Sequence, residues 1–194
     1  MNRKGFLVRK TKETYVRIKL NLDGKGENKI VTTIPFFDHM LELFSFHSGI
    51  DLYVTSKGDT DIDDHHLVED IGITLGMVFN MVLKDKSGIN RYGEVITPMD
   101  ESLSYVAVDI SGRGTLVYKV KFFPEYKKTS FDYNLIKEFL IAFVQNAKIT
   151  LHIKLLDGKN NHHICESIFK GLGRAIKEAI VVNKKKIPSS KGVL

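Results

Sequence analysis

The sequence contains few cysteines and no long hydrophobic run. Its single cysteine, Cys165, excludes a framework of disulfides within the chain and fits a reducing compartment. The first residues, MNRKGFLVRKTKE, contain no apolar stretch of signal-peptide length, and no segment approaches the roughly 20 apolar residues of a membrane helix. These absences predict a cytoplasmic protein without a membrane partner.

The chain is basic, but its charge is not extreme. It has 29 lysines and arginines against 23 acidic residues, a formal net charge of +6 over 194 residues. Such an excess suits an anionic partner, whether nucleic acid, a membrane surface or a phosphorylated metabolite. Nucleic acid has only this net charge in its favour, so we expect no nucleic-acid partner. The hydrophobic content of 43% is typical of a globular chain with a well-filled core.

The order of predicted elements repeats once along the chain. In each half, two strands are followed by a helix, a third strand and a long helix that carries two adjacent histidines. The first set covers residues 15–20, 29–34, 35–46, 50–54 and 64–83, and the second covers residues 105–110, 115–123, 132–145, 149–153 and 161–182. The polar segment KDKSGIN separates the two sets.

Matched elements in the same order indicate an internal duplication. We predict an α+β fold in which four helices pack together between or beside two sheets. The half-domains, residues 1–88 and 89–194, are expected to pack as one compact unit.

The two long helices begin with a repeated motif, in DIDDHHLVED (residues 61–70) and NNHHICES (residues 160–167). Residues four apart on an α-helix lie nearly above one another, so the first histidine and the glutamate of each motif can bind one metal ion. These pairs are His65 with Glu69 and His162 with Glu166. A single such pair is usually a solvated ion pair, but two copies at matched places favour metal binding.

The second histidines, His66 and His163, point away from these pairs. If the two motif helices pack antiparallel, His163 can join the first ion and His66 the second. The internal alignment offers a fourth ligand to each ion, with Glu138 at the first and His39 at the second. Imidazole and carboxylate ligands suit manganese, iron or zinc, and the sequence does not name the metal.

Cationic and hydroxyl side chains could bind a phosphate. Arg113 lies in the tight turn SGRG, Arg91 follows the midpoint segment, and Lys170 lies on the same helix face as His163. The segment PSSK offers two hydroxyls and an ammonium, from Ser189, Ser190 and Lys191. A basic terminus of this kind is otherwise usually a frayed tail.

Two histidines lie outside the repeated motifs. His47 follows His39 by two helical turns, and it either supports a ligand or faces the substrate. His152 alternates with apolar residues, which predicts a core position or a supporting contact to a ligand.

Six motifs resemble imidazoleglycerol-phosphate dehydratase of L-histidine biosynthesis: FFDHML, DDHHLVEDIGITLG, RYGEVITPMDESL, DISGRG, NNHHICESIFKGLGRAI and PSSKGVL. The likeness runs nearly from end to end. It implies a hydro-lyase that converts D-erythro-imidazoleglycerol phosphate into imidazoleacetol phosphate with two manganese ions per active site, although other divalent metals are possible. It also implies a shell of twenty-four subunits with the metal sites at subunit contacts, so that the two motif helices meet partly across chains.

The resemblance also assigns roles to residues. By motif, the metal ligands are His39, His65, His66, Glu69, His162, His163 and Glu166. The substrate contacts are Glu13, His47, Arg91, Arg113, Lys170, Ser189, Ser190 and Lys191. Some relatives carry histidine in place of Glu138, so the ligand role of Glu138 rests on the internal alignment.

The expected chemistry starts with loss of hydroxide from the carbon beside the imidazole ring. Two ions on the ring nitrogens would hold the ring as an imidazolate, and loss of hydroxide would leave a diazafulvene-like species. Removal of a neighbouring proton gives an enol that becomes the ketone, and Glu13 in the KET turn is the candidate for proton transfer. The groups expected to act in catalysis are Glu13, His65, Glu69, His162 and Glu166.

Two other classes of protein compete with this interpretation. A dinuclear metal-dependent phosphatase usually bridges ions roughly 3.5 to 4 Å apart, whereas here each glutamate is committed to its own ion. A non-catalytic metal-binding shell protein would explain the histidines but would leave Glu13 and the phosphate-binding groups without a role.

Overall fold

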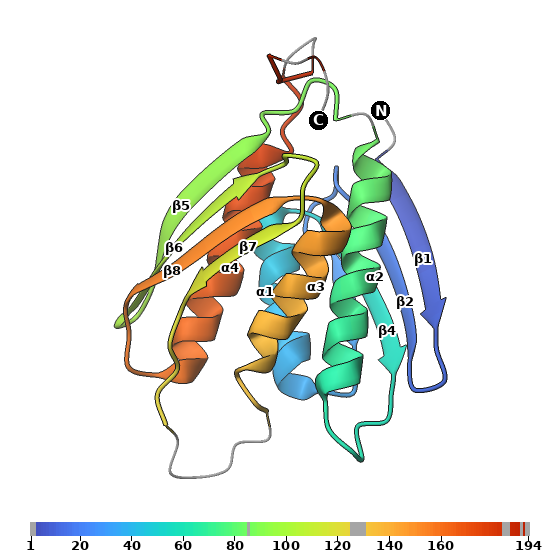
Figure 1. Cartoon of the computed structure of the whole chain (residues 1–194), viewed down its shortest axis with the longest axis vertical. Helices are drawn as coiled ribbons and strands as arrows, with labels where there is room; N and C mark the ends of the chain where they lie inside the picture. The colour runs from blue at the N-terminus through green and yellow to red at the C-terminus, as the bar shows by residue number, and fades with distance from the viewer. Residues whose placement is uncertain (1–2, 85, 125–130, 184–186, 191, 193–194) are drawn as a thin grey trace.

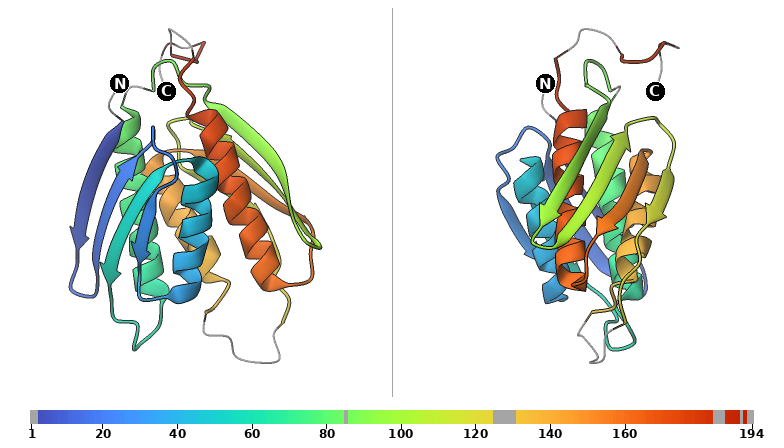
Figure 2. Two further views of the ribbon diagram at one scale, coloured as in Figure 1. Left: turned by 180° about the vertical axis from the view of Figure 1, so that it is seen from behind. Right: turned by 90° about the vertical axis from the view of Figure 1, so that its left-hand side faces the viewer.

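The computed structural model describes residues 3–84, 86–124, 131–183, 187–190 and 192. Over these residues the chain forms two four-stranded sheets, with the helices lying between them (Figure 1). The views in Figure 2 show the same layering from behind and from the side. The predicted α+β class and the placement of the helices between two sheets are therefore confirmed.

Each half of the chain follows the same order of elements. The first half contains β1 (Lys4–Lys10), β2 (Tyr15–Asn21), β3 (Asn28–Val31), α1 (Pro35–Ser48), β4 (Asp51–Lys57) and α2 (His65–Leu83). The second half contains β5 (Tyr92–Met99), β6 (Ser102–Asp109), β7 (Thr115–Lys119), α3 (Leu135–Ala147), β8 (Thr150–Asp157) and α4 (Asn161–Ala179).

The two sheets share one topology. Their strand orders are β1-β2-β4-β3 and β5-β6-β8-β7. In each sheet the last pair, β3 with β4 or β7 with β8, is parallel, and the other pairs are antiparallel. The matching topology confirms the internal duplication, while the boundary between residues 88 and 89 stays a prediction.

Strand β5 was not predicted from the sequence. Its segment contains Gly93 and Pro98, which are unfavourable inside a central strand, but β5 lies at the edge of its sheet, where proline is tolerated. Some predicted ends were also too long: β7 ends at Lys119 and α4 at Ala179.

The helix ends follow from local chemistry. Helix α1 begins with Pro35 and is followed by Gly49, whose φ of 71° ends the helix in the left-handed conformation that glycine adopts without strain. Helix α4 is preceded by Asn160, whose side chain accepts hydrogen bonds from the backbone N–H groups of His162 and His163. This cap fixes the helix start that carries the second histidine pair.

The helices pack in two pairs, α2 with α3 and α1 with α4. Glycines allow the close approach at equivalent places in the two pairs. A Cβ atom on Gly76 of α2 would lie 2.5 Å from the carbonyl oxygen of Phe143, and one on Gly173 of α4 would lie 2.8 Å from that of Phe44. Each glycine thus lets one helix rest directly on the backbone of its partner.

One hydrophobic cluster runs through both halves. At its centre the ring of Phe139 lies 5.1 Å from that of Phe37 and 5.9 Å from that of Phe169, which joins α3 to α1 and α4. Helix α2 is long and apolar enough to cross a membrane by composition, but 67% of its apolar window is buried inside the protein. It is therefore a core helix.

Candidate metal-binding and active site

Three side chains from two helices converge where α4 begins. The Nε2 atom of His162 lies 3.0 Å from Oε1 of Glu166, and the Nε2 atom of His39, on α1, lies 3.5 Å from the same oxygen. The ligand atoms of the three residues all lie within 4.8 Å of one another. The sequence predicted these three residues in one group with His66, and the packing of α1 against α4 brings the three together without His66.

Glu166 is the buried member of this group. Burial disfavours its charged form, but hydrogen bonds and charge from Lys170 and His39 outweigh burial and lower the pKa of the carboxyl. The Nζ atom of Lys170 lies 2.7 Å from Oε2 of Glu166. The carboxylate is therefore ionised and able to serve as a ligand.

The corresponding pair on α2 is more open. Nε2 of His65 lies 3.7 Å from Oε2 of Glu69, and both side chains are more than 40% exposed. Glu138, on α3, makes no ion pair with either one among the described residues. The α2 group is thus less complete within one chain than the α4 group.

The second histidines contact acids rather than the other motif helix. Nδ1 of His66 lies 3.2 Å from Oδ2 of Asp59, and Nδ1 of His163 lies 2.7 Å from Oε2 of Glu101. The antiparallel exchange of His66 and His163 is therefore wrong for a single chain. The reason is packing: α2 rests on α3 and α4 rests on α1, so the two motif helices are not partners.

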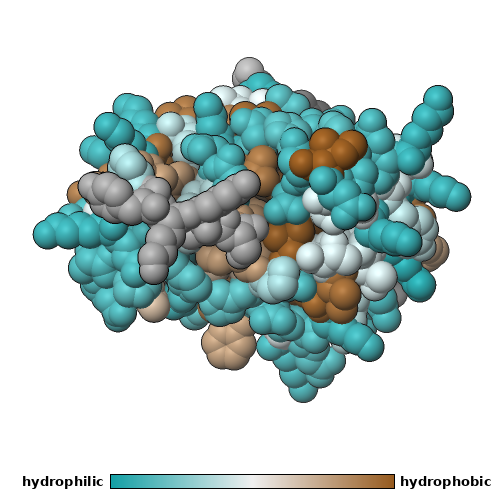
Figure 3. Space-filling view, turned by 90° about the horizontal axis from the view of Figure 1, so that it is seen from below, coloured by the Kyte–Doolittle hydropathy of each residue, from teal (hydrophilic) through white to brown (hydrophobic). Residues whose placement is uncertain are grey.

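Both motif helices begin at the same end of the molecule, the lower end in Figure 1. Viewed from that end, the surface is mainly hydrophilic with separate hydrophobic patches (Figure 3). One exposed apolar side chain in this region is Ile62, just before α2, with 75% of its surface accessible. The histidine pairs therefore lie at a hydrophilic, solvent-exposed surface.

Two predicted phosphate contacts lie far apart along α4, with Lys170 in the middle of the helix and Arg91 against its C-terminal end. Lys170 is close to the α4 group, as described. Arg91 donates its backbone N–H to the carbonyl of Ala179 at the far end of the helix, and its guanidinium binds Asp109 at 2.7 Å and the carbonyl of Pro188 at 3.0 Å. With a rise of about 1.5 Å per residue, Arg91 lies about 25 Å along the helix from His162.

The other predicted phosphate contacts come from loops and not from α4. Arg113 is exposed in the turn after β6, and its guanidinium donates to the carbonyl of Ser111 at 3.3 Å. Ser189 and Ser190 follow Pro188, which places them near Arg91. Lys191 lies outside the described residues.

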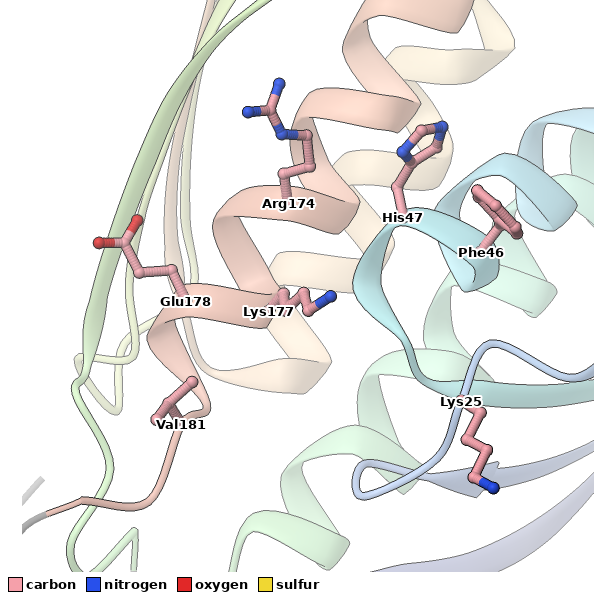
Figure 4. A pocket seen from close by; sticks show the side chains of 7 residues that line it. All are labelled: Lys25, Phe46, His47, Arg174, Lys177, Glu178 and Val181. Carbon is pink, nitrogen blue, oxygen red and sulfur yellow. The ribbon is translucent and has the colours of Figure 1, made fainter.

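His47 lines an open pocket of about 550 Å³ between the ends of α1 and α4 (Figure 4). Arg174 and Lys177 of α4 and Lys25 of the loop after β2 contribute to the same pocket. Burial, together with the charges of Lys170 and Arg174, lowers the pKa of His47, so the ring is neutral near pH 7. The core position predicted for His152 is wrong, since its side chain is exposed on β8 between two buried residues, while the alternative of a supporting contact to a ligand stays a prediction.

Sequence reasoning missed three acids near the site. Asp70 of α2 pairs with Arg9 at 2.6 Å and accepts a hydrogen bond from Thr14, which fastens the turn of Glu13 onto the helix. Asp59 and Glu101 contact the second histidines, and Glu101 was recoverable from its place in the duplicated hairpin. Asp70 ends the motif DIDDHHLVED but was assigned no role, and no motif included Asp59.

The fold and the site define an internally duplicated α+β protein whose imidazole and carboxylate groups are arranged to bind divalent metal ions. A model of the family "Imidazoleglycerol-phosphate dehydratase" matches residues 32–176. The chain therefore belongs to the imidazoleglycerol-phosphate dehydratase family.

Similar proteins and solved structures carry the same family name. The imidazoleglycerol-phosphate dehydratase of Endomicrobium trichonymphae is 52% identical over 99% of this chain and 98% of its own length. That of Clostridium botulinum is 53% identical over 100% of this chain and 99% of its own length. The crystal structure from Staphylococcus aureus matches with a TM-score of 0.82 and 39% identity over 92% of this chain and 100% of that one. The crystal structure from Pyrococcus furiosus matches with a TM-score of 0.84 and 38% identity, over 97% of this chain and 100% of that one.

Proposed function

We propose that the chain is a hydro-lyase of L-histidine biosynthesis that removes water from imidazoleglycerol phosphate to give imidazoleacetol phosphate. Membership of the family supports the reaction. The observation within the chain that carries the proposal is the convergence of His39, His162 and Glu166, which supplies three ligand atoms to one position. A soluble cytoplasmic location is part of the same proposal.

The donor set fits a divalent metal ion. Two imidazoles and an ionised carboxylate lie together at the α4 group, and His65 with Glu69 form the start of a second group. We propose two Mn²⁺ ions per active site, with other divalent metals as substitutes. The proposed ligands are His39, His65, His66, Glu69, Glu138, His162, His163 and Glu166. When bound, such ions act as Lewis acids that polarise the imidazole ring of the substrate.

Glu13 is the proposed proton-transfer group. It lies in the turn between β1 and β2, with its side chain 57% exposed, and its Oε2 atom lies 3.7 Å from Nδ1 of His66. The bond from Thr14 to Asp70 fixes the turn while leaving the Glu13 carboxylate without a close hydrogen bond of its own among the described contacts. The carboxylate can therefore approach a carbon-bound proton of the substrate.

The phosphate is proposed to bind the cationic and hydroxyl groups predicted from the sequence. These are Arg91, Arg113, Lys170, Ser189, Ser190 and Lys191, with His47 as a further contact. A substrate of one ring, three carbons and a phosphate is far too short to reach both His162 and Arg91 of one chain, because about 25 Å of helix separates them. If Arg91 binds the phosphate, it would come from a second copy, which supports self-association; the assembly of twenty-four subunits with metal sites at subunit contacts is proposed from the family resemblance.

The test is a product assay with purified protein, imidazoleglycerol phosphate and Mn²⁺. The proposed function predicts formation of the ketone imidazoleacetol phosphate without release of inorganic phosphate. Phosphate release in the same tube would instead indicate a metal-dependent phosphatase. Neither product from the metal-loaded assembly would indicate a non-catalytic metal-binding shell protein.

A further inference from the structure

The two halves place a glutamate at the same point of their hairpins. In the first sheet Lys4 pairs with Asn21, and in the second Tyr92 pairs with Asp109, so equivalent residues differ by 88 positions. By this difference Glu101, in the turn between β5 and β6, is the counterpart of Glu13. Both turns face the second histidine of a motif helix.

Glu101 is fully engaged. Its Oε2 atom lies 2.7 Å from Nδ1 of His163. Its Oε1 atom accepts hydrogen bonds from the backbone N–H groups of Asn160 at 2.9 Å and Lys159 at 3.3 Å. Because both oxygens are bound, one to the ring and one to the chain just before α4, Glu101 fixes the direction of the His163 ring relative to the helix.

Asp59 fixes the ring of His66 by an equivalent hydrogen bond. It lies in the loop between β4 and α2, and its Oδ2 atom is 3.2 Å from Nδ1 of His66. The side chain of Asp59 is 23% exposed, compared with 57% for Glu13, whose nearest oxygen is 3.7 Å from the same ring atom. The hydrogen bond to His66 therefore belongs to Asp59 and not to the counterpart of Glu101.

We propose that Glu101 and Asp59 are positioning residues for His163 and His66, an inference that rests on the proposed metal-binding function. A neutral imidazole carries its proton on only one nitrogen. When Nδ1–H donates to a carboxylate, Nε2 keeps its lone pair and can bind a metal ion, and the carboxylate fixes the ring orientation. Each acid thus selects Nε2 as the donor atom of its histidine.

Because Asp59 binds His66 while Glu101 itself binds His163, the two equivalent glutamates Glu13 and Glu101 differ in their contacts. In the second half the hairpin glutamate is occupied by His163 and by backbone N–H groups. In the first half Asp59 supplies the bond to the histidine, so the hairpin glutamate stays available for proton transfer. The duplicated position has produced one fixed carboxylate and one free carboxylate.

The test compares manganese affinities of assembled, purified variants by competition with a chelator. Glu101→Ala should weaken one of the two ions by about 10- to 100-fold, the usual effect of removing a partner of a ligating histidine. Glu101→Gln should restore most of the affinity, because the amide oxygen accepts the same Nδ1 proton. Glu94→Ala is the matched control, since its carboxylate contacts the Tyr105 hydroxyl and no histidine. Melting temperature and assembly size are measured in parallel to separate lost affinity from lost folding.

The first half is tested in the same way. Asp59→Ala should weaken the other ion and Asp59→Asn should restore it, whereas Glu13→Gln should keep both ions and lose turnover. Wild-type affinity in Glu101→Ala and Asp59→Ala would overturn the inference. So would equal loss in the alanine and amide variants, because it would make the carboxylates direct ligands. Failure of the unaltered protein to bind manganese would contradict the proposed function itself.

Discussion

The Nε2 atom of His39 lies 3.5 Å from Oε1 of Glu166, although 127 positions separate the two residues in the chain. His39 belongs to the first half of the duplication and Glu166 to the second. The contact forms because α1 packs against α4. The proposed metal group is therefore a product of how the two halves join, and neither half contains it alone.

Replacing the first histidine of either motif should remove metal. We expect His65→Ala and His162→Ala each to lower the manganese content by about one ion per active site, because each histidine begins a chelating pair. Elemental analysis of the purified assemblies measures this loss. His152→Ala is the control, since His152 is exposed on β8 and belongs to neither motif. Unchanged metal content in the two motif variants would refute the ligand assignment.

Glu138 tests the internal alignment. If Glu138 is the counterpart of His39, Glu138→Gln should weaken one ion selectively and leave the other unchanged. A graded challenge with a mild chelator, followed by metal analysis, distinguishes loss of one ion from loss of both. Retention of both ions would show that Glu138 is not a metal ligand, although it aligns with His39.

Removal of residues 189–194 tests the phosphate assignment. The truncated chain keeps Pro188, whose carbonyl accepts from Arg91, so the local backbone contact remains. We expect a strongly raised KM for imidazoleglycerol phosphate with little change in bound manganese, because substrate binding is lost and the metal ligands are intact. A normal KM would mean that the segment is a tail without a binding role.

The Glu101–His163 contact should stabilise the metal-free protein over a limited pH range. The bond from His163, with help from the backbone N–H of Asn160, lowers the pKa of Glu101 from 4.5 to about 2, and Glu101 raises the pKa of His163 above 6.5. The glutamate contribution is present above pH 4.5 and is lost as the pH falls toward about 2. The histidine contribution is present below pH 6.5 and is lost as the pH rises through the raised pKa.

The contact should therefore stabilise most between about pH 4.5 and 6.5, and only modestly because both side chains are partly exposed. The measurement is the melting temperature of metal-free wild-type protein and of Glu101→Gln across the pH range. We expect their difference to peak within this interval. A difference that keeps growing into alkaline solution would contradict the assigned charges.

The close packing of α2 on α3 predicts a cost for added volume. Gly76→Ala should lower the free energy of unfolding by about 1 to 3 kcal/mol, because the new methyl group would meet the backbone of Phe143 and Ala147. Met77→Ala, at an exposed neighbouring position, should change it by less than about 0.5 kcal/mol. Chemical denaturation of both variants gives the comparison, and equal stability would argue against direct helix contact.

Much of the fold was predictable because it depends on local periodicity and on duplication. The same logic placed His39 with His162 and Glu166. The predicted exchange of His66 and His163 was wrong for a single chain, because the choice of helix partners depends on where glycines such as Gly76 allow close approach in three dimensions. Asp59 was missed since it lies in a loop without a repeated motif, whereas Glu101 could have been found by aligning the two hairpins.

Metal ions at the two motif helices are proposed to serve the dehydration. The most direct measurement is the rate of ketone formation from imidazoleglycerol phosphate as manganese is added back, ion by ion, to the chelator-treated assembly. We predict no activity without metal and full activity at two ions per active site. Full activity in the stripped protein, or no ketone at full manganese loading, would contradict the account.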